Sequence, residues 1–244
     1  LRDGRTGNLL RTCDHNDYIN DILCIPSLGK VIAAGLRGFH FWDREDGEPL
    51  TEKPGNVDGI VTFGGLPSLS PGETRIILRG RYYIALWDTR IHRLLWRDDF
   101  LEENRIRKIV TFPDGKRFAT SDITGTIKVR SIETGEVLAA LHILPEGFLW
   151  ETPPDDHAPS GWLFTDREDL ITVTARSGND GGTRIFREGV SEHRAYLRIY
   201  NNRAMVTAKI AGKEEYRQQV ALHARVLDRA RIGNGSVGLR PALT

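Results

Sequence analysis

The chain has 244 residues, of which 39% are hydrophobic and 27% charged, and its formal net charge at pH 7 is +1. These values are typical of a soluble globular protein and give no bulk electrostatic case for binding nucleic acid or a membrane surface. Two cysteines, Cys13 and Cys24, are too few for a disulfide framework, so we expect a reduced, cytoplasmic protein. No apolar run approaches the length of a membrane span.

The most informative pattern is a repeat with a period of about 40–45 residues. Its copies can be aligned at Leu1–Leu10, Phe41–Leu50, Leu86–Arg90 and Val129–Leu138. Two copies carry an apolar-Trp-Asp sequence, at Trp42-Asp43 and Trp87-Asp88. Self-similarity at this period with this signature is typical of a propeller built from four-stranded blades.

Each repeat predicts short strands separated by Gly, Pro, Asn and Asp clusters. In chain order the expected strands are Ile19–Ile25, Lys30–Ala34, Phe39–Trp42 and Glu48–Thr51, then Gly59–Phe63, Thr74–Leu78, Tyr82–Trp87 and His92–Trp96, then Arg105–Phe112, Arg117–Thr120, Gly125–Arg130 and Val137–Leu141. The Asp that follows the third strand is expected to accept turn N–H groups. Gly35 and Gly80 occupy equivalent turn positions, which suits a backbone with positive φ.

With these residues the chain resembles the WD-repeat β-propeller family. The resemblance is carried by Trp42-Asp43, by Trp87-Asp88, by Ser121-Asp122 with the strand that follows, and by the Thr-Gly-x-x-Leu pieces at Thr6–Leu10 and Thr134–Leu138. Asp14-His15 resembles the Gly-His element of that family. The third and fourth repeats lack this His, and the fourth has Arg130-Ser131 in place of Trp-Asp. The resemblance implies a protein-interaction module whose buried His–Asp networks are incomplete.

The expected fold is therefore all-β, a partial WD-repeat-type β-propeller of about four and a half blades with a C-terminal helical extension. The predicted divisions are a propeller over 1–190, a helical tail over 191–232 and a flexible end over 233–244. Within the propeller, repeats are expected around 1–18, 19–58, 59–104 and 105–145, with an atypical last blade over 146–190. In that blade Trp162–Thr165, Leu170–Ala175 and Thr183–Arg187 read as strands.

The tail has the pattern of helices. Ser191 is a plausible N-cap for Glu192–Asn201, and Arg203–Ile210 fits a short helix or a strand. From Lys213 to Ile232 the apolar residues follow helical spacing and form one stripe, at Tyr216, Val220, Ala224 and Leu227. Such a stripe needs a surface to bury against, so we expect the tail to dock on the last blade.

Leu1 aligns with the end of a third strand, so the first blade is expected to be incomplete or completed from outside this sequence. The chain begins with Leu, and its single Met is Met205. We therefore interpret it as the C-terminal part of a larger multidomain protein, of a kind found in bacteria, with an effector domain upstream. An exposed blade edge also predicts that the isolated chain is poorly soluble or oligomeric.

Chemistry-bearing clusters are few. Asp155-Asp156-His157 is the tight acid–His cluster, but a metal site needs three or four ligands and no others are paired nearby in sequence. No Gly-x-Ser-x-Gly frame or phosphate loop is present. We therefore expect no catalytic residue, no metal and no cofactor. Arg37, Arg79 and Arg81 fall in the turns between second and third strands and are the candidate contacts for a protein partner.

The preferred functional hypothesis is a non-catalytic interaction module, the sensor or scaffold region of a larger regulatory protein. Its partners would be another protein and the upstream domains of its own parent chain, with no membrane and no nucleic acid. The alternative is an accessory or catalytic region of an enzyme with a site near the 153–161 loop. A basic excess over 191–232, nine Arg or Lys against four acids, keeps nucleic-acid binding as a third hypothesis.

Overall fold

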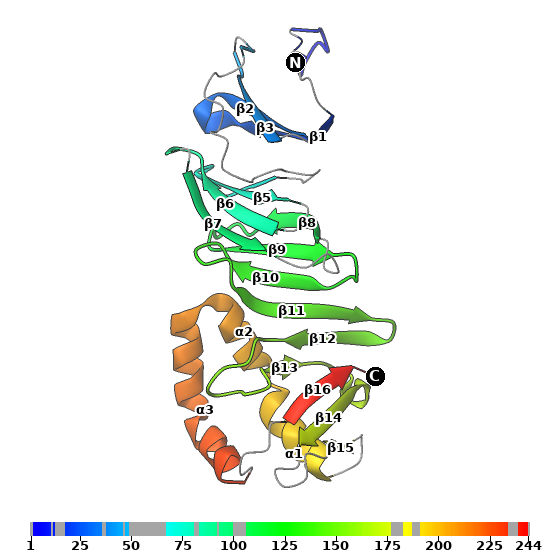
Figure 1. The fold of residues 1–244 in the computed structure, drawn as a ribbon. Helices are drawn as coiled ribbons and strands as arrows, with labels where there is room; N and C mark the ends of the chain where they lie inside the picture. Colours follow the sequence, from blue (N-terminus) through cyan, green and yellow to red (C-terminus); the bar gives the residue numbers. More distant parts are fainter. Residues whose placement is uncertain are drawn as a thin grey trace. The chain divides into compact units, whose positions relative to one another are not determined.

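The computed structural model describes residues 2–10, 12, 18–35, 38–45, 47–48, 67–80, 83–91, 93–99, 106–176, 183–186, 191–233 and 239–243. The chain divides into two compact units, and Figure 1 labels the helices and strands of both. Unit 1 comprises Leu1–Thr124 and Ser131–Glu136, and unit 2 comprises Gly125–Arg130 and Val137–Thr244. Most of the described secondary structure is antiparallel β-sheet, as expected for a propeller-like fold.

The first sheet of unit 1 has the order β1-β2-β3. These strands are β1 (Ile19–Ile25), β2 (Lys30–Gly35) and β3 (Gly38–Asp43). A short 3-10 helix, η1 (Pro26–Leu28), links the first two, and Gly29 closes it with φ 61°. All three strands fall where the sequence predicts them, while the expected fourth strand at Glu48–Thr51 lies largely outside the described residues.

The second sheet has the order β4-β5-β6-β7. Its strands are β4 (Ser68–Leu69), β5 (Arg75–Arg79), β6 (Tyr83–Asp88) and β7 (Arg93–Asp99). Three of them match the expected strands. The first described strand is the short β4, and the expected strand Gly59–Phe63 lies outside the described residues. Trp42 and Trp87 are each the penultimate residue of the third strand, which confirms their equivalence.

The fourth repeat supplies β8 (Ile106–Thr111), β9 (Arg117–Asp122), β10 (Ile127–Ser131) and β11 (Val137–Leu144), again as expected. β8 pairs with β9 in unit 1. In unit 2, β12 (Gly147–Glu151) pairs with β11, and β13 (Leu163–Phe164) pairs with β12. The residues after 145 therefore extend the ladder that contains β11.

Two apolar cores lie between neighbouring β-elements of unit 1 and join them. In the first, Ile25, Ile32 and Phe41 of the β1–β3 sheet pack with Trp87 and its neighbours in the β4–β7 sheet. The second core joins the opposite side of the β4–β7 sheet to the β8–β9 hairpin, and its members are Ile77, Ile84, Leu86, Ile106, Ile109, Phe118 and Ile132. Because both of its sides are covered, β6 is buried along its whole length and reads as a continuous apolar run.

The C-terminal sheet of unit 2 has the order β15-β14-β16. β14 (Ile171–Arg176) follows the 3-10 helix η3 (Glu168–Leu170), and β15 (Thr183–Phe186) pairs with it. Leu239–Leu243 forms β16 and pairs antiparallel with β14. These five residues belong to the end over 233–244, for which the sequence predicts no strand. The strand follows a Gly-rich segment and has only five residues. A segment this short shows too little hydrophobic periodicity for a strand to be predicted from it.

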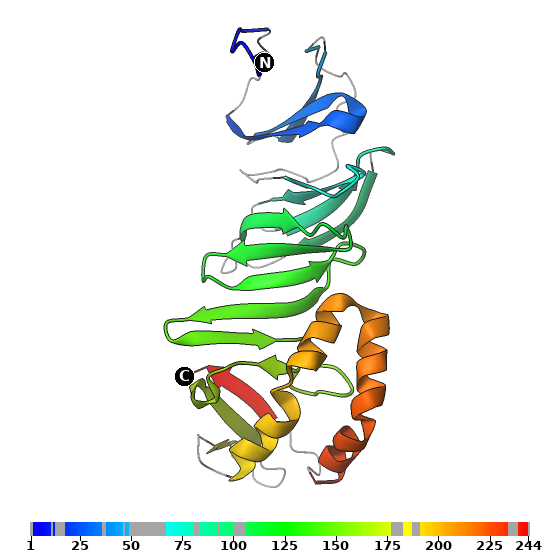
Figure 2. The same cartoon turned by 180° about the vertical axis from the view of Figure 1, so that it is seen from behind.

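Within the described part of unit 2, helices lie beside the sheets (Figure 2). They are α1 (Ser191–Tyr200), α2 (Arg203–Ala211) and α3 (Lys213–Gly233). Asn202 begins α2, because its side chain accepts a hydrogen bond from the backbone N–H of Met205. Gly212 separates α2 from α3 with φ 148°. The ambiguous segment at Arg203–Ile210 is therefore a helix.

The helices are docked on unit 2. Tyr196 and Leu197 of α1 share a core with Leu149, Leu163 and Ile171. Met205 and Val206 of α2 pack with Ala158 and Trp162, and the expected stripe residues Tyr216 and Val220 pack against the same cluster. The predicted docking of the tail is confirmed for these residues. The side chains of Ala224 and Leu227 lie outside the described part of the stripe.

Candidate functional site

The turns around Asp3, Asp43 and Ser131, at equivalent places in three of the repeats, share one construction. Asp3, Asp43 and Ser131 each accept the backbone N–H of a glycine four residues later, over 2.8, 3.0 and 2.9 Å. The same residues donate their own N–H to the carbonyl five residues on, in Asn8, Glu48 and Glu136. The three glycines, Gly7, Gly47 and Gly135, have φ of 73°, 66° and 76°. Three of the sequence repeats therefore share one loop geometry at equivalent positions.

The threonines of the Thr-Gly-x-x-Leu pieces accept equivalent hydrogen bonds in two of these loops. The Thr6 hydroxyl accepts the N–H of Asn8, and the Thr134 hydroxyl accepts the N–H of Glu136, both over 3.3 Å. Arg2 and Leu9 form an isolated antiparallel bridge across the first loop. The alignment of the chain's opening residues with the later repeats is thus supported by hydrogen bonds.

The aspartates after the strands anchor their turns, as expected. Asp88 accepts the N–H groups of Arg90 and Ile91, over 2.9 and 3.2 Å. Asp122, in the Ser-Asp turn, accepts both the N–H and the hydroxyl of Thr124. These bonds fix the turns at the edges of the sheets. Because surface turns held by a rigid sheet are frequent sites of recognition, they are candidate contact surfaces.

Arg79 is the described member of the proposed arginine patch, and Arg37 and Arg81 lie outside the described residues. Arg79 is half-buried at the end of β5, and its guanidinium donates to the backbone carbonyl of Ile106 at the start of β8. Burial lowers the pKa of this guanidinium. Arg79 therefore joins the β4–β7 sheet to the β8–β9 hairpin, a structural role that sequence reasoning missed.

Gly80 also differs from its expected role. Its φ does not lie in the left-handed region; instead, a Cβ at this position would overlap the ring of Tyr83. The Gly80 N–H donates to the Tyr83 carbonyl over 2.8 Å, so the turn closes with the ring lying against the glycine. The close approach of the Tyr83 ring, and not a positive φ, explains why residue 80 is a glycine.

The 153–161 loop is organised around Asp155. One of its carboxylate oxygens accepts the N–H groups of His157 and Ala158, over 2.8 and 2.9 Å. The other accepts the Tyr216 hydroxyl over 2.7 Å and pairs with Lys209 Nζ at 2.5 Å. These contacts tie the loop to α2 and α3.

An aromatic contact completes this loop. Trp162 is buried, and its indole N–H donates to the Tyr216 hydroxyl over 2.7 Å. The Lys209 ammonium lies 4.4 Å from the Tyr216 ring centroid, and the His157 ring lies edge-on to it at 6.3 Å. Tyr216 is thus the point where the loop meets the helices. Helical spacing placed Tyr216 on a buried stripe, but no sequence signal linked it or Lys209 to Asp155.

Electrostatics explain why Asp155 is charged in this half-buried place. Burial acts to raise its pKa, but hydrogen bonds from Lys209, Tyr216 and two backbone N–H groups outweigh burial and hold the pKa below its usual value. Burial is the main cause that raises the pKa of the Tyr216 hydroxyl, and the hydrogen bond to Asp155 raises this pKa further. The Asp155 carboxylate therefore holds the 153–161 loop against α2 and α3.

We expect Asp155→Asn to destabilise unit 2 by about 1–3 kcal/mol near neutral pH, because charge-assisted hydrogen bonds are lost from a half-buried site. A carboxyl whose folded pKa is depressed contributes stability above its unfolded pKa, and this is lost as pH falls through the folded value. The loss of unfolding free energy in the variant should therefore be complete at pH 7. It should shrink as the pH falls below 3.8, the ordinary pKa of the Asp155 carboxyl group. Urea unfolding of both proteins at several pH values measures it.

Asp156→Asn is the matched control, because Asp156 is the exposed neighbour in the same loop. We expect its unfolding free energy to stay within about 0.5 kcal/mol of the parent. A deficit of Asp155→Asn that does not change with pH would contradict the role given to the Lys209 ion pair.

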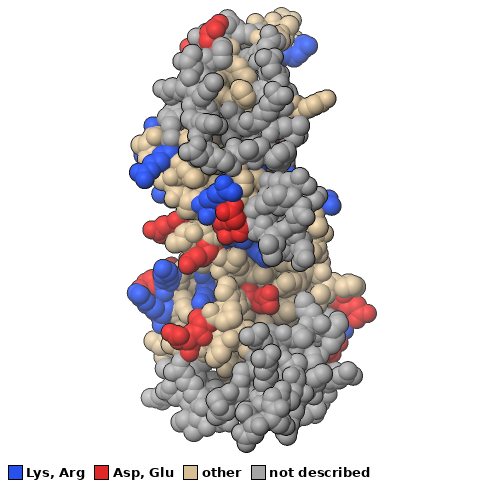
Figure 3. All heavy atoms as spheres, in the orientation of Figure 1, with Lys and Arg blue, Asp and Glu red and all other residues tan. Residues whose placement is uncertain are grey.

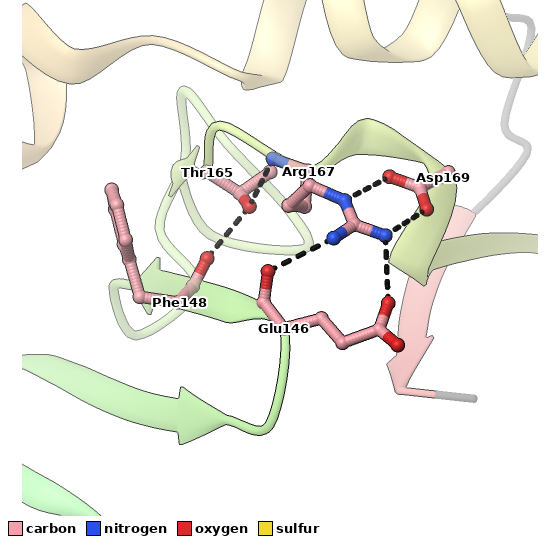
Figure 4. A network of polar contacts seen from close by, with 5 residues as sticks. All are labelled: Glu146, Phe148, Thr165, Arg167 and Asp169. Atoms are coloured by element: carbon pink, nitrogen blue, oxygen red, sulfur yellow. Dashed lines mark hydrogen bonds and ion pairs between the residues drawn. The ribbon is translucent and has the colours of Figure 1, made fainter.

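A second polar network joins the β11–β12 turn to η3, and sequence reasoning missed it (Figure 4). Arg167 donates to the carbonyl of Glu146 over 2.9 Å and pairs with the Glu146 and Asp169 carboxylates at 3.1 and 2.6 Å. The Thr165 hydroxyl donates to the Phe148 carbonyl and accepts the Arg167 N–H. The Arg167 guanidinium donates to Glu146 and to Asp169, so the network holds the turn in place.

The charge on the described surface is mixed. In Figure 3 basic and acidic side chains lie interspersed on the visible face. Within the described residues, no group of three or more His, Cys, Asp and Glu side chains is placed to hold a metal ion. The helices of the described residues include none with both the length and the apolarity needed to cross a membrane.

No family model matches the chain. It is 26% identical over 129 residues to a guanine nucleotide-binding protein subunit beta of Nicotiana plumbaginifolia, an alignment that covers 51% of this chain and 34% of that protein. The chain thus spans about a third of the length of this relative. A solved structure described as "Structure of U3-55K" is similar with a TM-score of 0.44 and 12% identity, over 71% of this chain and 53% of that one.

The similarity to the beta subunit agrees with the repeated turns and stacked antiparallel sheets of unit 1. Together they support a WD-repeat, β-propeller-like class of protein. A protein-interaction module is the kind of function that this class suggests.

Proposed function

We propose that the chain is a non-catalytic recognition module that acts as the sensor or scaffold region of a larger regulatory protein, bound to a protein partner and to other domains of its parent chain. The observation that supports this most is the repeated, hydrogen-bonded turn after the third strands of unit 1. Rigid stacked sheets with such turns present a fixed set of side chains at their rim, which is what specific protein recognition needs.

The partner-binding surface we propose is the rim that carries Arg37, Arg79 and Arg81, at the ends of the strands opposite to the third-strand turns. An arginine there would pair with carboxylates of an acidic partner. Arg79 is a poor position for testing this idea, because its guanidinium also donates to the Ile106 carbonyl and its loss would disturb the packing. The test therefore uses Arg37 and Arg81 alone.

We expect the double variant Arg37→Glu/Arg81→Glu to weaken partner binding by about 10-fold or more, since reversal replaces attraction by repulsion. The partner is first identified by cross-linking and pull-down with the whole chain and with residues 1–190, and its Kd is then measured by calorimetry. Arg107→Glu/Lys108→Glu, a reversal of equal charge on exposed residues of β8, is the control and should change the Kd by less than about 3-fold.

Equal affinities of the two double variants would dismiss the arginine rim. The alternative, an enzyme site near the 153–161 loop, makes a different prediction: His157→Ala would abolish a measured turnover. In the recognition hypothesis His157→Ala leaves partner binding at the rim unchanged. The cytoplasmic placement belongs to the same proposal, and a fluorescent fusion of the natural full-length polypeptide tests it.

A further inference from the structure

Glu73, in the turn between β4 and β5, has a backbone conformation that residues with side chains rarely adopt. Its φ of 58° lies in the left-handed region, and within the described residues it is the one non-glycine residue with a positive φ. A Cβ atom disfavours this region, so glycine is its usual occupant. Backbone strain of this kind persists where the surrounding structure or a function requires it, so the side chain of Glu73 needs an explanation.

The fourth repeat has glycine at the equivalent place. Two six-residue turns, 70–75 and 112–117, are each closed by a hydrogen bond of 2.9 Å from the N–H of the first residue to the carbonyl of the last. Within them, Glu73 and Gly115 each donate an N–H back to the carbonyl of the first residue, over 2.9 and 3.1 Å. Gly115 has a φ of 65°. The turn therefore closes with glycine, and its geometry alone does not call for a glutamate.

The side chain of Glu73 reaches into an earlier repeat. Its Oε2 accepts the backbone N–H of Ser27, which lies 46 residues earlier in the chain, over 2.6 Å. Ser27 belongs to η1, the 3-10 helix between β1 and β2. Hydrogen bonds from the Ser27 hydroxyl and from its N–H lower the pKa of the Glu73 carboxyl group, so the carboxylate form is favoured. A charged group of the third repeat thus holds a turn of the second repeat.

The backbone from which this side chain extends is fixed by its own repeat. The Glu73 carbonyl accepts the Thr89 hydroxyl over 2.8 Å, and the Thr74 carbonyl accepts the Thr89 N–H over 3.0 Å. Thr89 itself is buried, at 2% exposed. Because the turn is held from behind, the bond from Glu73 to Ser27 determines where η1 lies relative to the β4–β5 turn.

We propose that Glu73 is a latch between two repeats, and that its strained conformation is retained because the carboxylate holds η1 against the β4–β5 turn. Apolar packing between sheets is non-directional and leaves the surface turns free to shift. A charge-assisted hydrogen bond has a preferred length and angle, so it fixes one turn relative to the other. When the latch is removed, η1 opens locally while the apolar core below it stays packed. This role is independent of the function proposed above.

Hydrogen exchange of the Ser27 amide in the whole chain tests the latch. Ser27 is exposed, so its amide depends on the bond to Glu73 for protection. We expect Glu73→Ala to speed its exchange by about 10-fold or more, because the N–H loses its acceptor. Glu73→Gln keeps a side-chain oxygen at the same reach, and its rate should stay within about 3-fold of the parent rate. The amide of Ile77, a fully buried residue of β5, is the internal control and should exchange equally in all three proteins.

Thermal melts of three variants separate the latch from the backbone strain. Glu73→Ala keeps a left-handed Cβ but loses the carboxylate, so its Tm should fall by about 2 °C or more. Glu73→Gly loses both, so its Tm should exceed that of Glu73→Ala by the effect of the strain alone. Gly115→Ala adds the same strain in the fourth repeat, where the nearest atom to a new Cβ is Cδ of Pro71 at 3.9 Å. Its Tm should fall by the amount that separates the two Glu73 variants.

Two results would overturn the latch. The first is a Ser27 amide that exchanges at the same rate in Glu73→Ala as in the parent. The second is a Glu73→Gly protein whose Tm lies above that of the parent by as much as the Tm of Gly115→Ala lies below it. In that case the Glu73 side chain would contribute strain and nothing else.

Discussion

Trp87→Ala should lower the free energy of unfolding of unit 1 by about 3–5 kcal/mol. Trp87 is 4% exposed and lies in the core between the β1–β3 and β4–β7 sheets. Removing the indole leaves a cavity with sheets on both sides, and neither can collapse into it without breaking strand register. Urea unfolding followed by far-UV circular dichroism measures the loss.

Ile91→Ala is the control for Trp87→Ala. Ile91 follows the same strand by three residues but is 62% exposed in the turn, so its truncation should cost no more than about 0.5 kcal/mol. A Trp87→Ala protein that unfolds at the same urea concentration as Ile91→Ala would show that no second sheet covers the indole.

Gly161→Ala should have a comparable effect in unit 2. Gly161 has φ +79°, and a Cβ at this position would overlap the backbone carbonyl oxygen of Thr152. Left-handed strain and forced displacement of the chain each cost roughly 1–3 kcal/mol. Thr152 cannot withdraw freely, because its N–H donates to the Trp162 carbonyl over 2.9 Å and its hydroxyl accepts the Trp162 N–H over 2.9 Å.

Gly125→Ala separates the two contributions. Gly125 has φ +84°, but nothing lies within 4 Å of a Cβ built there, so this variant carries the backbone strain alone. We expect Gly161→Ala to melt well below Gly125→Ala in a thermal scan of the two proteins. Equal Tm values would mean that the 153–161 loop does not close against Thr152.

Strand positions could be predicted because each strand is bounded by its own turn chemistry. Asp43, Asp88 and Asp122 sit where the sequence pattern requires a turn anchor, and each accepts the turn N–H groups expected of it. Gly7, Gly47 and Gly135 then permit the left-handed residue of the loop. These are local interactions, which a single sequence encodes within five or six residues.

The contacts that sequence reasoning missed join residues far apart in the chain. Asp155 meets Lys209 and Tyr216 across more than fifty residues, and Arg79 reaches the Ile106 carbonyl in the next repeat. Nothing in the spacing of these residues distinguishes them from ordinary surface charges. The same limit explains β16, whose partner β14 lies over sixty residues earlier.

A double-mutant cycle between Phe41 and Trp87 tests most directly whether successive repeats stack as sheets. Both side chains belong to the core between the β1–β3 and β4–β7 sheets, although they come from different repeats. Residues that share a packed core show coupling energies of about 0.5–3 kcal/mol, whereas distant sites add within about 0.3–0.5 kcal/mol. Phe41→Ala, Trp87→Ala and the double variant are unfolded in urea beside the parent. We predict a coupling energy above about 0.5 kcal/mol, and strictly additive losses would contradict the stacked arrangement.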